Sequence, residues 1–265
     1  MYATKYAKAT SLQDAVAKLA AADDGKFLGG GQTLLATMKQ RLAAPSDLID
    51  VTKIPELKGI TVEGDTIVVG AASTHSEVAQ SADIQRLLPV LSGLAATIGD
   101  PAVRNMGTMG GSVANNDPAA DYPAALLGLN ATLTTSKGSY AAADFFTGIF
   151  ETALDEDEII VKIAFPIPQK AAYEKFRNPA SRYSLCSVFV AMTADGPRVA
   201  VTGSGNDGVF RVAEMEAALA SNWSPDAVSG ITIDPDTMLS DIHGSAEYRA
   251  HLVTVLAARA VAKAG

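Results

Sequence analysis

Two glycine-rich segments carry most of the chemistry that can be inferred from this sequence. The first, "GGGQT", occupies residues 29–33, and the second, "GTMGGSV", occupies residues 107–113. Glycine has no Cβ, so its backbone can take positive φ and approach a ligand closely. Successive N–H groups at such a turn, together with a helix N-terminus, form a concave site for an anion. The residue types therefore favour phosphate, and two such segments could hold a diphosphate from both sides.

A tight strand-to-helix turn that binds nothing would use the same residues, because short glycine matches often arise by chance. The first segment lacks the G-K-[ST] of a P-loop and the spacing of a G-x-G-x-x-G fingerprint. Its Thr33 does add a hydroxyl donor. On this segment alone, both interpretations stay open.

Two carboxylates, Asp117 and Asp121, follow the second segment. Carboxylates repel phosphate but accept hydrogen bonds from hydroxyl groups, as on a ribose or a ribityl chain. Both also have structural interpretations, because "NNDP" is typical of a turn and Asp121 could cap the helical pattern "YPAALLGLN". For Asp117 the turn is favoured, whereas for Asp121 the two interpretations are balanced.

Other kinds of site are disfavoured by composition. Cys186 is the only cysteine, so an intrachain disulfide and a thiolate-ligated zinc or iron–sulfur site are excluded. It lies in the apolar run "SLCSVFVAM", which predicts a buried small hydrophobe. His75, His243 and His251 are dispersed, so no metal site is expected, and no nucleophile–base pair is visible.

The overall charge narrows the classes of partner. The net charge of −8 and the absence of a basic run argue against binding to nucleic acid or to an anionic membrane surface. The N-terminal residues lack the pattern of a signal peptide, and no stretch is apolar enough to span a bilayer. We therefore expect a cytoplasmic protein.

Hydrophobic periodicity and turn residues predict an α+β chain. Helices are predicted over residues 12–24, capped by Ser11, over 34–45, from a cap at Ser73 or Thr74 to about 99 with a break at Pro89, and over 122–130, 212–221 and 245–263. Strands are predicted near 26–28, 47–54 and 157–168, and hairpins within 57–73 and 131–146. Residues 173–211 are rich in strand signals, and the linker-like "PIPQKAA" suggests a boundary near 168–172.

Taken in order, several motifs resemble the FAD-binding medium subunit of molybdenum hydroxylases, the group of xanthine dehydrogenase, carbon monoxide dehydrogenase and aldehyde oxidoreductase. They are "FLGGGQTLL", "IGDPAVRNMGTMGGSVANNDPAADYPAALLGLNATL", "DEIIVKIAFP" and "YEKFRNPASRYSLCSV". The resemblance covers essentially the whole chain. The family motifs are usually close to A-G-G-H-S and T-I-G-G, where this chain has G-G-G-Q-T and T-M-G-G, so polar side chains keep their places.

This resemblance implies the fold of the vanillyl-alcohol-oxidase (PCMH) type, in which two α/β lobes enclose FAD. The implied domains are an FAD-binding domain over 1–170, with lobes at about 1–52 and 53–170, and a C-terminal α+β domain over 171–265. It also implies no catalytic side chain and no metal ligand, and a set of cofactor-binding residues: Leu28, Gly29, Gly30, Gly31, Gln32, Thr33, Leu34, Leu35, Ile98, Gly99, Thr108, Met109, Gly110, Gly111, Ser112, Val113, Asp121, Ile160 and Lys175.

Within that set the resemblance implies different tasks. Residues 28–35 would surround the diphosphate and ribityl region, and residues 108–113 would add a second backbone contact. Asp121 would bind ribityl or ribose hydroxyls, while Ile98 and Gly99 would lie near the adenine. Lys175 and Tyr183 match positions near the flavin ring, although Lys175 could equally be a solvated strand lysine.

The function implied is that of an electron-transfer oxidoreductase subunit. A large subunit would hold the molybdopterin–molybdenum centre, and a small subunit would hold two [2Fe–2S] clusters, in a dimer of heterotrimers. Electrons would pass through FAD in this chain to an external acceptor such as NAD⁺, a quinone, a cytochrome or O₂. Two alternatives stay open here: a self-sufficient flavin-dependent oxidase of the same fold, and a non-redox nucleotide-binding module.

Overall fold

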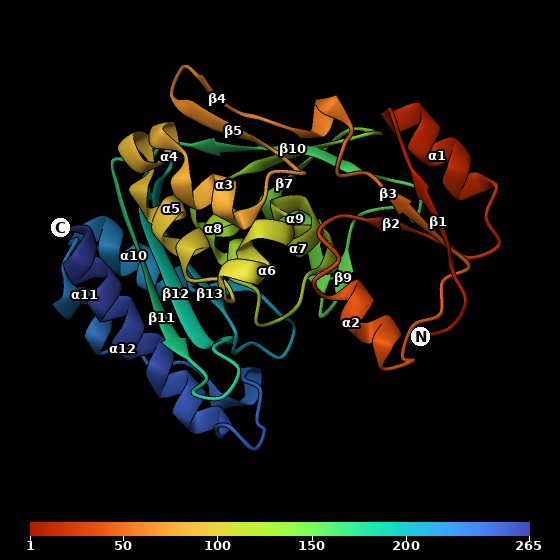
Figure 1. Ribbon diagram of the computed structural model, residues 1–265. Coiled ribbons are helices and arrows are strands. Elements are labelled where there is room, and N and C mark those ends of the chain that lie inside the picture. Colours follow the sequence, from red (N-terminus) through yellow and green to blue (C-terminus); the bar gives the residue numbers. More distant parts are fainter.

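The computed structural model describes residues 1–265 and contains three main β-sheets, each with its own set of helices (Figure 1). In Figure 1 the N-terminal sheet lies at the right and the C-terminal helices lie at the left, with the helices of the middle segment between them. Helices are mixed along the chain with strands that mostly pair antiparallel, so the predicted α+β class is confirmed.

The first sheet is small and parallel. Its strands are arranged in the order β1 (Lys5–Lys8), β3 (Asp47–Asp50), β2 (Gly25–Leu28). The connections are α1 (Leu12–Ala20) and α2 (Leu34–Lys39). Ser11 caps α1 by accepting a hydrogen bond from the Asp14 N–H, as predicted, whereas α2 ends earlier than the predicted 34–45. Strand β2 runs directly into the first glycine segment, which therefore lies at the carboxyl edge of the sheet.

The second sheet is antiparallel and follows the predicted hairpins. Its order is β4 (Ile60–Glu63), β5 (Thr66–Gly70), β10 (Ile160–Pro166), β6 (Thr132–Thr135), β7 (Ser139–Ala141). The helices of this part are α3 (His75–Gln80), α4 (Ala82–Leu87), α5 (Pro89–Ala96), α6 (Pro101–Met106), α7 (Met109–Asn115), α8 (Tyr122–Gly128) and α9 (Ala142–Phe145). A short hairpin completes it, with strands β8 (Phe146–Gly148) and β9 (Glu151–Thr152).

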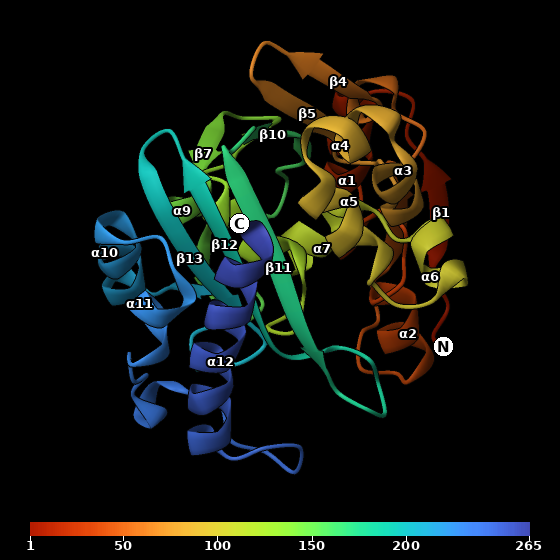
Figure 2. The same cartoon turned by 90° about the vertical axis from the view of Figure 1, so that its left-hand side faces the viewer.

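The third sheet is antiparallel, in the order β11 (Lys170–Arg177), β12 (Ser184–Thr193), β13 (Gly196–Thr202), β14 (Phe210–Arg211). Helix α12 (Ala246–Ala264) packs along β11 and β12 (Figure 2), and α10 (Ala213–Ser221) packs on β13. Helix α11 (Pro225–Ser229) packs against α12. Short 3₁₀ turns lie at Pro55–Leu57 and Pro235–Thr237.

The other face of the third sheet is buried by the middle segment of the chain. Helix α8 packs on β12 and β13, and Phe189 of β12 is so close to α8 that a Cβ at Gly128 would lie 2.5 Å from its ring. Tyr173 and Phe189 belong to the same hydrophobic cluster as Ile67 and Leu126, which lie in the second sheet and in its helices. The predicted boundary near 168–172 falls between β10 and β11, but the sheets on its two sides share one core.

Helix α7 forms in a segment whose composition does not favour one. Residues 107–125 are rich in glycine and turn-forming residues, which are poor in both helix and strand, yet α7 contains Gly110 and Gly111. Thr108 caps this helix through its side chain, and Gly110 packs against Ala71, where a Cβ would meet the Ala71 Cβ at 2.6 Å. Tertiary packing thus outweighs the helix propensity of glycine, which is about 1 kcal/mol less favourable than that of alanine.

We predict that the shared core makes the chain unfold as one cooperative unit. Phe189→Ala should lower the stability of the whole chain by about 3–5 kcal/mol, because it leaves a cavity between α8 and the third sheet. Calorimetry should show a single transition at a reduced midpoint. Val62→Ala, at a position 39% exposed, is the control and should change little. Two separate transitions, with only one displaced by Phe189→Ala, would contradict a shared core.

Candidate functional site

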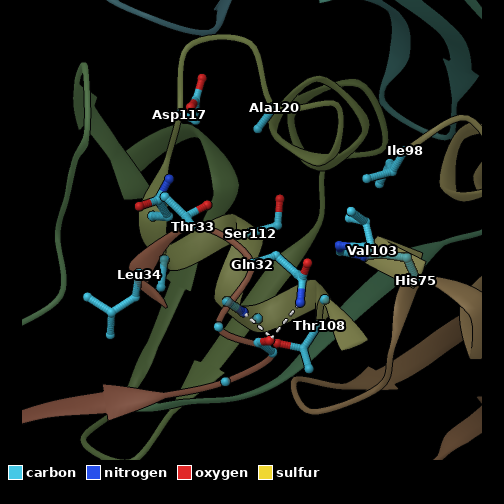
Figure 3. A pocket seen from close by; sticks show the side chains of 18 of the residues that line it. Gln32, Thr33, Leu34, His75, Ile98, Val103, Thr108, Ser112, Asp117 and Ala120 are labelled. Carbon is cyan, nitrogen blue, oxygen red and sulfur yellow. Dashed lines mark hydrogen bonds between the residues drawn. The ribbon is translucent and has the colours of Figure 1, made fainter. Parts of the chain in front are cut away.

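One large cleft of about 850 Å³ brings the two glycine segments together. Its volume is within the range of about 300–1,000 Å³ that is usual for small-molecule sites. Figure 3 shows Gln32, Thr33 and Leu34 approaching from the first segment, with Thr108 and Ser112 beside them and Ile98, Val103 and His75 on the opposite side. The β11–β12 loop contributes Tyr183 to the same cleft.

The first glycine segment presents unused hydrogen bond donors. Every backbone N–H from Gly29 through Leu34 lacks an acceptor within the chain, and all of these residues line the cleft. Gly31 has φ of +69°, which favours glycine and turns the chain from β2 into α2. Successive free amides at a turn that borders a cleft form a concave donor site, so this row of donors suits a ligand rich in acceptor oxygens.

The second glycine segment differs from this expectation. The amides of Met109, Gly110 and Ser112 donate to Ser73, Ala71 and Thr108 carbonyls at 2.9, 2.8 and 3.1 Å. The Gly111 amide donates to Thr108 Oγ1 at 3.2 Å. The predicted second backbone contact with a diphosphate is therefore wrong for these amides, because the turns of α7 and its packing consume them. What remains for a ligand are the Thr108 N–H, the Ser112 hydroxyl and a surface without Cβ atoms.

The two segments touch each other at their glycines. A Cβ at Gly30 would overlap the Met106 carbonyl oxygen and lie 2.5 Å from Gly107 Cα. A Cβ at Gly29 would lie 2.9 Å from Thr108 Oγ1. Glycine is needed at position 30 because two backbones pass there in direct contact. The second segment thus forms the wall against which the first is held.

A buried ion pair lies at another part of the cleft. Lys175 Nζ of β11 is 2.8 Å from Asp121 Oδ2, and both side chains are 5% exposed. The Tyr173 hydroxyl donates to the other oxygen, Asp121 Oδ1. Burial, together with the Asp121 carboxylate, raises the pKa of Tyr173 well above its ordinary value, so the phenol stays protonated. Asp121 makes no cap hydrogen bond to α8, so the capping interpretation is wrong.

The predicted site residues are gathered here with three exceptions. All line the cleft except Leu35, Met109 and Val113. Met109 and Val113 are fully buried in the core under α7, and Leu35 packs with Leu28 in a small cluster around α2. The resemblance implies whole segments, 28–35 and 108–113, whereas the helical turns of α2 and α7 direct these three side chains away from the cleft.

Asp117 and Cys186 have the roles in turn formation and core packing that the sequence predicts. The Asp117 carboxylate accepts a hydrogen bond from the Ala119 N–H at 2.8 Å, as in an Asx-turn, although the residue also lines the cleft. Cys186 is fully buried, and burial raises its pKa to about 12, so it behaves as a small hydrophobe. No cluster of three or more His, Cys, Asp or Glu side chains is suitable for a metal ion.

Sequence reasoning missed His75 and the residues that form the apolar walls. His75 begins α3 and lines the cleft while only 4% exposed. Val51, Leu57, Val103 and Ile159 also line it. None of them lies in a glycine motif, and only "STHSEV", in which the capping box Thr74–Glu77 contains the histidine, could have drawn attention to His75.

The fold and the cleft define the class of protein. A glycine-bordered cleft that offers a row of free amides, apolar walls and a buried carboxylate suits a nucleotide cofactor. Residues 2–168 match the family described as "FAD binding domain in molybdopterin dehydrogenase", and the chain belongs to this family. It is an FAD-binding oxidoreductase subunit, and this assignment decides against a non-redox module and a self-sufficient oxidase.

Curated relatives extend over the full chain. It is 36% identical to the nicotine 6-hydroxylase medium subunit of Paenarthrobacter nicotinovorans, covering 99% of this chain and 98% of that protein. It is 32% identical to the carbon monoxide dehydrogenase medium chain of Hydrogenophaga pseudoflava, covering 97% and 95%.

Solved structures agree with these relatives. A reconstituted CO dehydrogenase from Oligotropha carboxidovorans superposes with a TM-score of 0.89 at 31% identity, covering 99% of this chain and 98% of that chain. Quinoline 2-oxidoreductase from Pseudomonas putida 86 gives 0.88 at 28% identity, covering 99% and 97%. The FAD-binding fold implied by the resemblance is therefore confirmed.

The chemistry of the cleft lining suits FAD. The free amides of residues 29–34 match the acceptor oxygens of a diphosphate. The apolar side chains of Ile98, Val103 and Ile160 suit flat aromatic rings, and Asp121 suits hydroxyl groups.

None of the helices combines the length and the apolar character that a membrane crossing requires.

We predict that Gly30→Ala abolishes the retention of FAD. The added Cβ would overlap the Met106 carbonyl oxygen, so the two walls of the cleft must separate. The measurement is the flavin absorbance of the purified chain together with its thermal midpoint. Gly138→Ala, where nothing lies within 4 Å of a Cβ, is the matched control. Full flavin content in Gly30→Ala would contradict the apposition.

We also predict a pH dependence of stability that comes from His75. Burial, with a smaller effect of Arg104, lowers the pKa of His75 to about 4. The unfolded chain therefore binds a proton more readily, and the contribution is fully present above about pH 6.5 and is lost as the pH falls toward 4. Its upper bound is on the order of 3 kcal/mol. Urea unfolding of the chain and of His75→Phe at pH 7 and pH 4.5 should show a smaller loss in the variant.

Proposed function

We propose that FAD binds in the cleft with its diphosphate on the free amides of residues 29–34. The observation that carries this proposal is the unbroken row of donors without acceptors in the chain, at a turn that Gly30 holds against the second segment. Thr33 and Ser112 add hydroxyls that make no hydrogen bond elsewhere, and Thr108 adds its backbone N–H.

The remaining predicted contacts are assigned by position along the cleft. Ile98 and Gly99, with Val103, form the apolar end proposed for the adenine. Asp121 is placed to accept hydrogen bonds from ribityl hydroxyls. Lys175 and Tyr183 come from β11 and the loop after it, at the end of the cleft proposed for the isoalloxazine. Ile160, at the start of β10, supplies apolar contact.

In this proposal FAD, when bound, would supply the redox chemistry between a partner's iron–sulfur clusters and an external acceptor. The residues of this chain bind and orient the cofactor. Lys175 donates only to Asp121, which leaves two further N–H donors for the cofactor or water. No nucleophile–base pair is needed, and the cleft contains none.

The proposed assembly follows the relatives, several of which are designated medium subunits or medium chains and align over nearly their full lengths. We propose a large molybdopterin-binding subunit and a small subunit with two [2Fe–2S] clusters as partners, in a dimer of heterotrimers located in the cytoplasm. The test is affinity purification of the tagged chain from its native cells. Recovery without a molybdopterin-containing subunit and an iron–sulfur subunit would contradict the assembly.

The cofactor part is tested on the isolated chain. Titration with FAD should show one equivalent bound, with a change in flavin absorbance, and Gly30→Ala should show none. A folded wild-type chain that stays colourless and takes up no FAD would contradict the proposed function.

We predict that Asp121→Asn and Lys175→Met shift the reduction potential of bound FAD in opposite directions. Lys175→Met leaves the buried Asp121 carboxylate uncompensated, and this negative charge should make reduction harder. Asp121→Asn leaves the ammonium uncompensated and should make reduction easier. Anaerobic reductive titration of each variant gives the potentials, and the double variant is the control, with a potential close to that of the wild type. Shifts of the same sign would contradict a position beside the isoalloxazine.

A further inference from the structure

His75 lies in the wall of the cleft and is held on two sides. Its backbone N–H donates to the Gly107 carbonyl oxygen at 2.9 Å. Its ring Nδ1 lies 3.2 Å from the Tyr122 hydroxyl oxygen, in the core beneath α8. The ring is 4% exposed, so few rotamers are open to it. The opposite edge of the ring, with Nε2, is beside Gly107, where a Cβ would lie 2.6 Å from Nε2.

The contact with Tyr122 determines which ring nitrogen carries the proton. Tyr122 is fully buried, and its hydroxyl has no partner other than His75. Burial raises the pKa of Tyr122 above its ordinary value, so the phenol keeps its proton. If Nδ1 carried the imidazole proton, the phenol hydrogen would have no acceptor in the core, which costs about 1–3 kcal/mol. The phenol therefore donates to Nδ1, and the imidazole proton is on Nε2.

The Nε2–H group of His75 has no hydrogen bond acceptor in the chain, yet it is accessible from the cleft. No acceptor within the protein receives a hydrogen bond from it. The only fully enclosed side-chain nitrogen or oxygen without a partner is Trp223 Nε1, so Nε2 must be accessible. His75 lines the cleft, and Gly107 beside it contacts Gly30. This unpaired donor therefore lies beside Gly107, in the same cleft as the free amides of residues 29–34.

We propose that His75 is a neutral hydrogen bond donor to an acceptor oxygen of the bound dinucleotide, and that Tyr122 is the positioning residue that fixes its tautomer. The position beside Gly107 and Gly30 assigns the acceptor to the diphosphate or to the ribose next to it. A neutral donor adds a directional hydrogen bond here without burying a charge. This inference rests on the proposed function, because it takes FAD as the ligand of the cleft.

The first experiment measures the dissociation constant of FAD for the full chain and its variants. His75→Phe keeps a ring but removes the donor, and the dissociation constant should rise about 10-fold. His75→Gln keeps an N–H donor at similar reach and should recover most of the affinity. The dissociation constant of ADP, which contains the diphosphate and the adjoining ribose, should rise by a similar factor in His75→Phe. Equal affinity of the wild type and a folded His75→Phe would overturn the proposal.

The second experiment observes the tautomer directly and does not depend on whether a variant folds. Nitrogen-15 NMR of the wild-type chain should show the Nε2–H form of His75, with Nδ1 unprotonated, and its Nε2 signal should shift when FAD is added. In Tyr122→Phe both tautomers should be populated, a change that loss of packing alone would not produce. The Nδ1–H form in the wild type, or an Nε2 signal unchanged by bound FAD, would overturn the proposal. Failure of the wild type to bind FAD would instead contradict the proposed function.

Discussion

The backbone at Gly30 passes directly against the backbone at Met106 and Gly107, and the geometry of the cleft depends on that contact. No side chain fits between the two segments. The contact sets the distance between the carboxyl edge of the first sheet and the start of α7, and so positions the amides of residues 29–34 over the cleft. The lobes meet here through main chain alone, which explains why the motif requires glycine at a position without positive φ.

Although the two glycine segments look alike in sequence, they do different work. The first keeps its amides free because β2 ends at Leu28 and α2 begins only at Leu34. In the second segment the amides donate hydrogen bonds to oxygens of Ser73, Ala71 and Thr108, so this segment forms a rigid wall. Its glycines serve close packing, against Ala71 and against the first segment. An anion site needs free donors, and only one of these segments has them.

The third sheet closes the cleft from the other side and links it to the rest of the core. Strand β11 carries Tyr173 and Lys175, which hold Asp121, while Tyr122, the next residue, holds His75. Asp121 and Tyr122 thus support two different parts of the cleft from one turn at the start of α8. Because α8 also packs on β12 and β13, displacement of the third sheet would disturb both contacts. The positions of the polar groups in the site therefore depend on the packing of the shared hydrophobic core.

The sequence by itself determined the α+β class, both hairpins, the cap at Ser11, a cap at Ser73 or Thr74, the burial of Cys186, and the predicted site residues other than Leu35, Met109 and Val113. These features follow from local periodicity, turn chemistry and ordered motifs. Only the tertiary structure decided that Met109 and Val113 face the core, that α7 is helical, that Asp121 pairs with Lys175, and that His75 belongs to the site. Such features depend on contacts between residues far apart in the chain, such as Gly110 with Ala71 or His75 with Tyr122. A local sequence pattern does not indicate which distant group will accept a hydrogen bond from a given donor. For this reason the features of the second kind could not be predicted from the sequence.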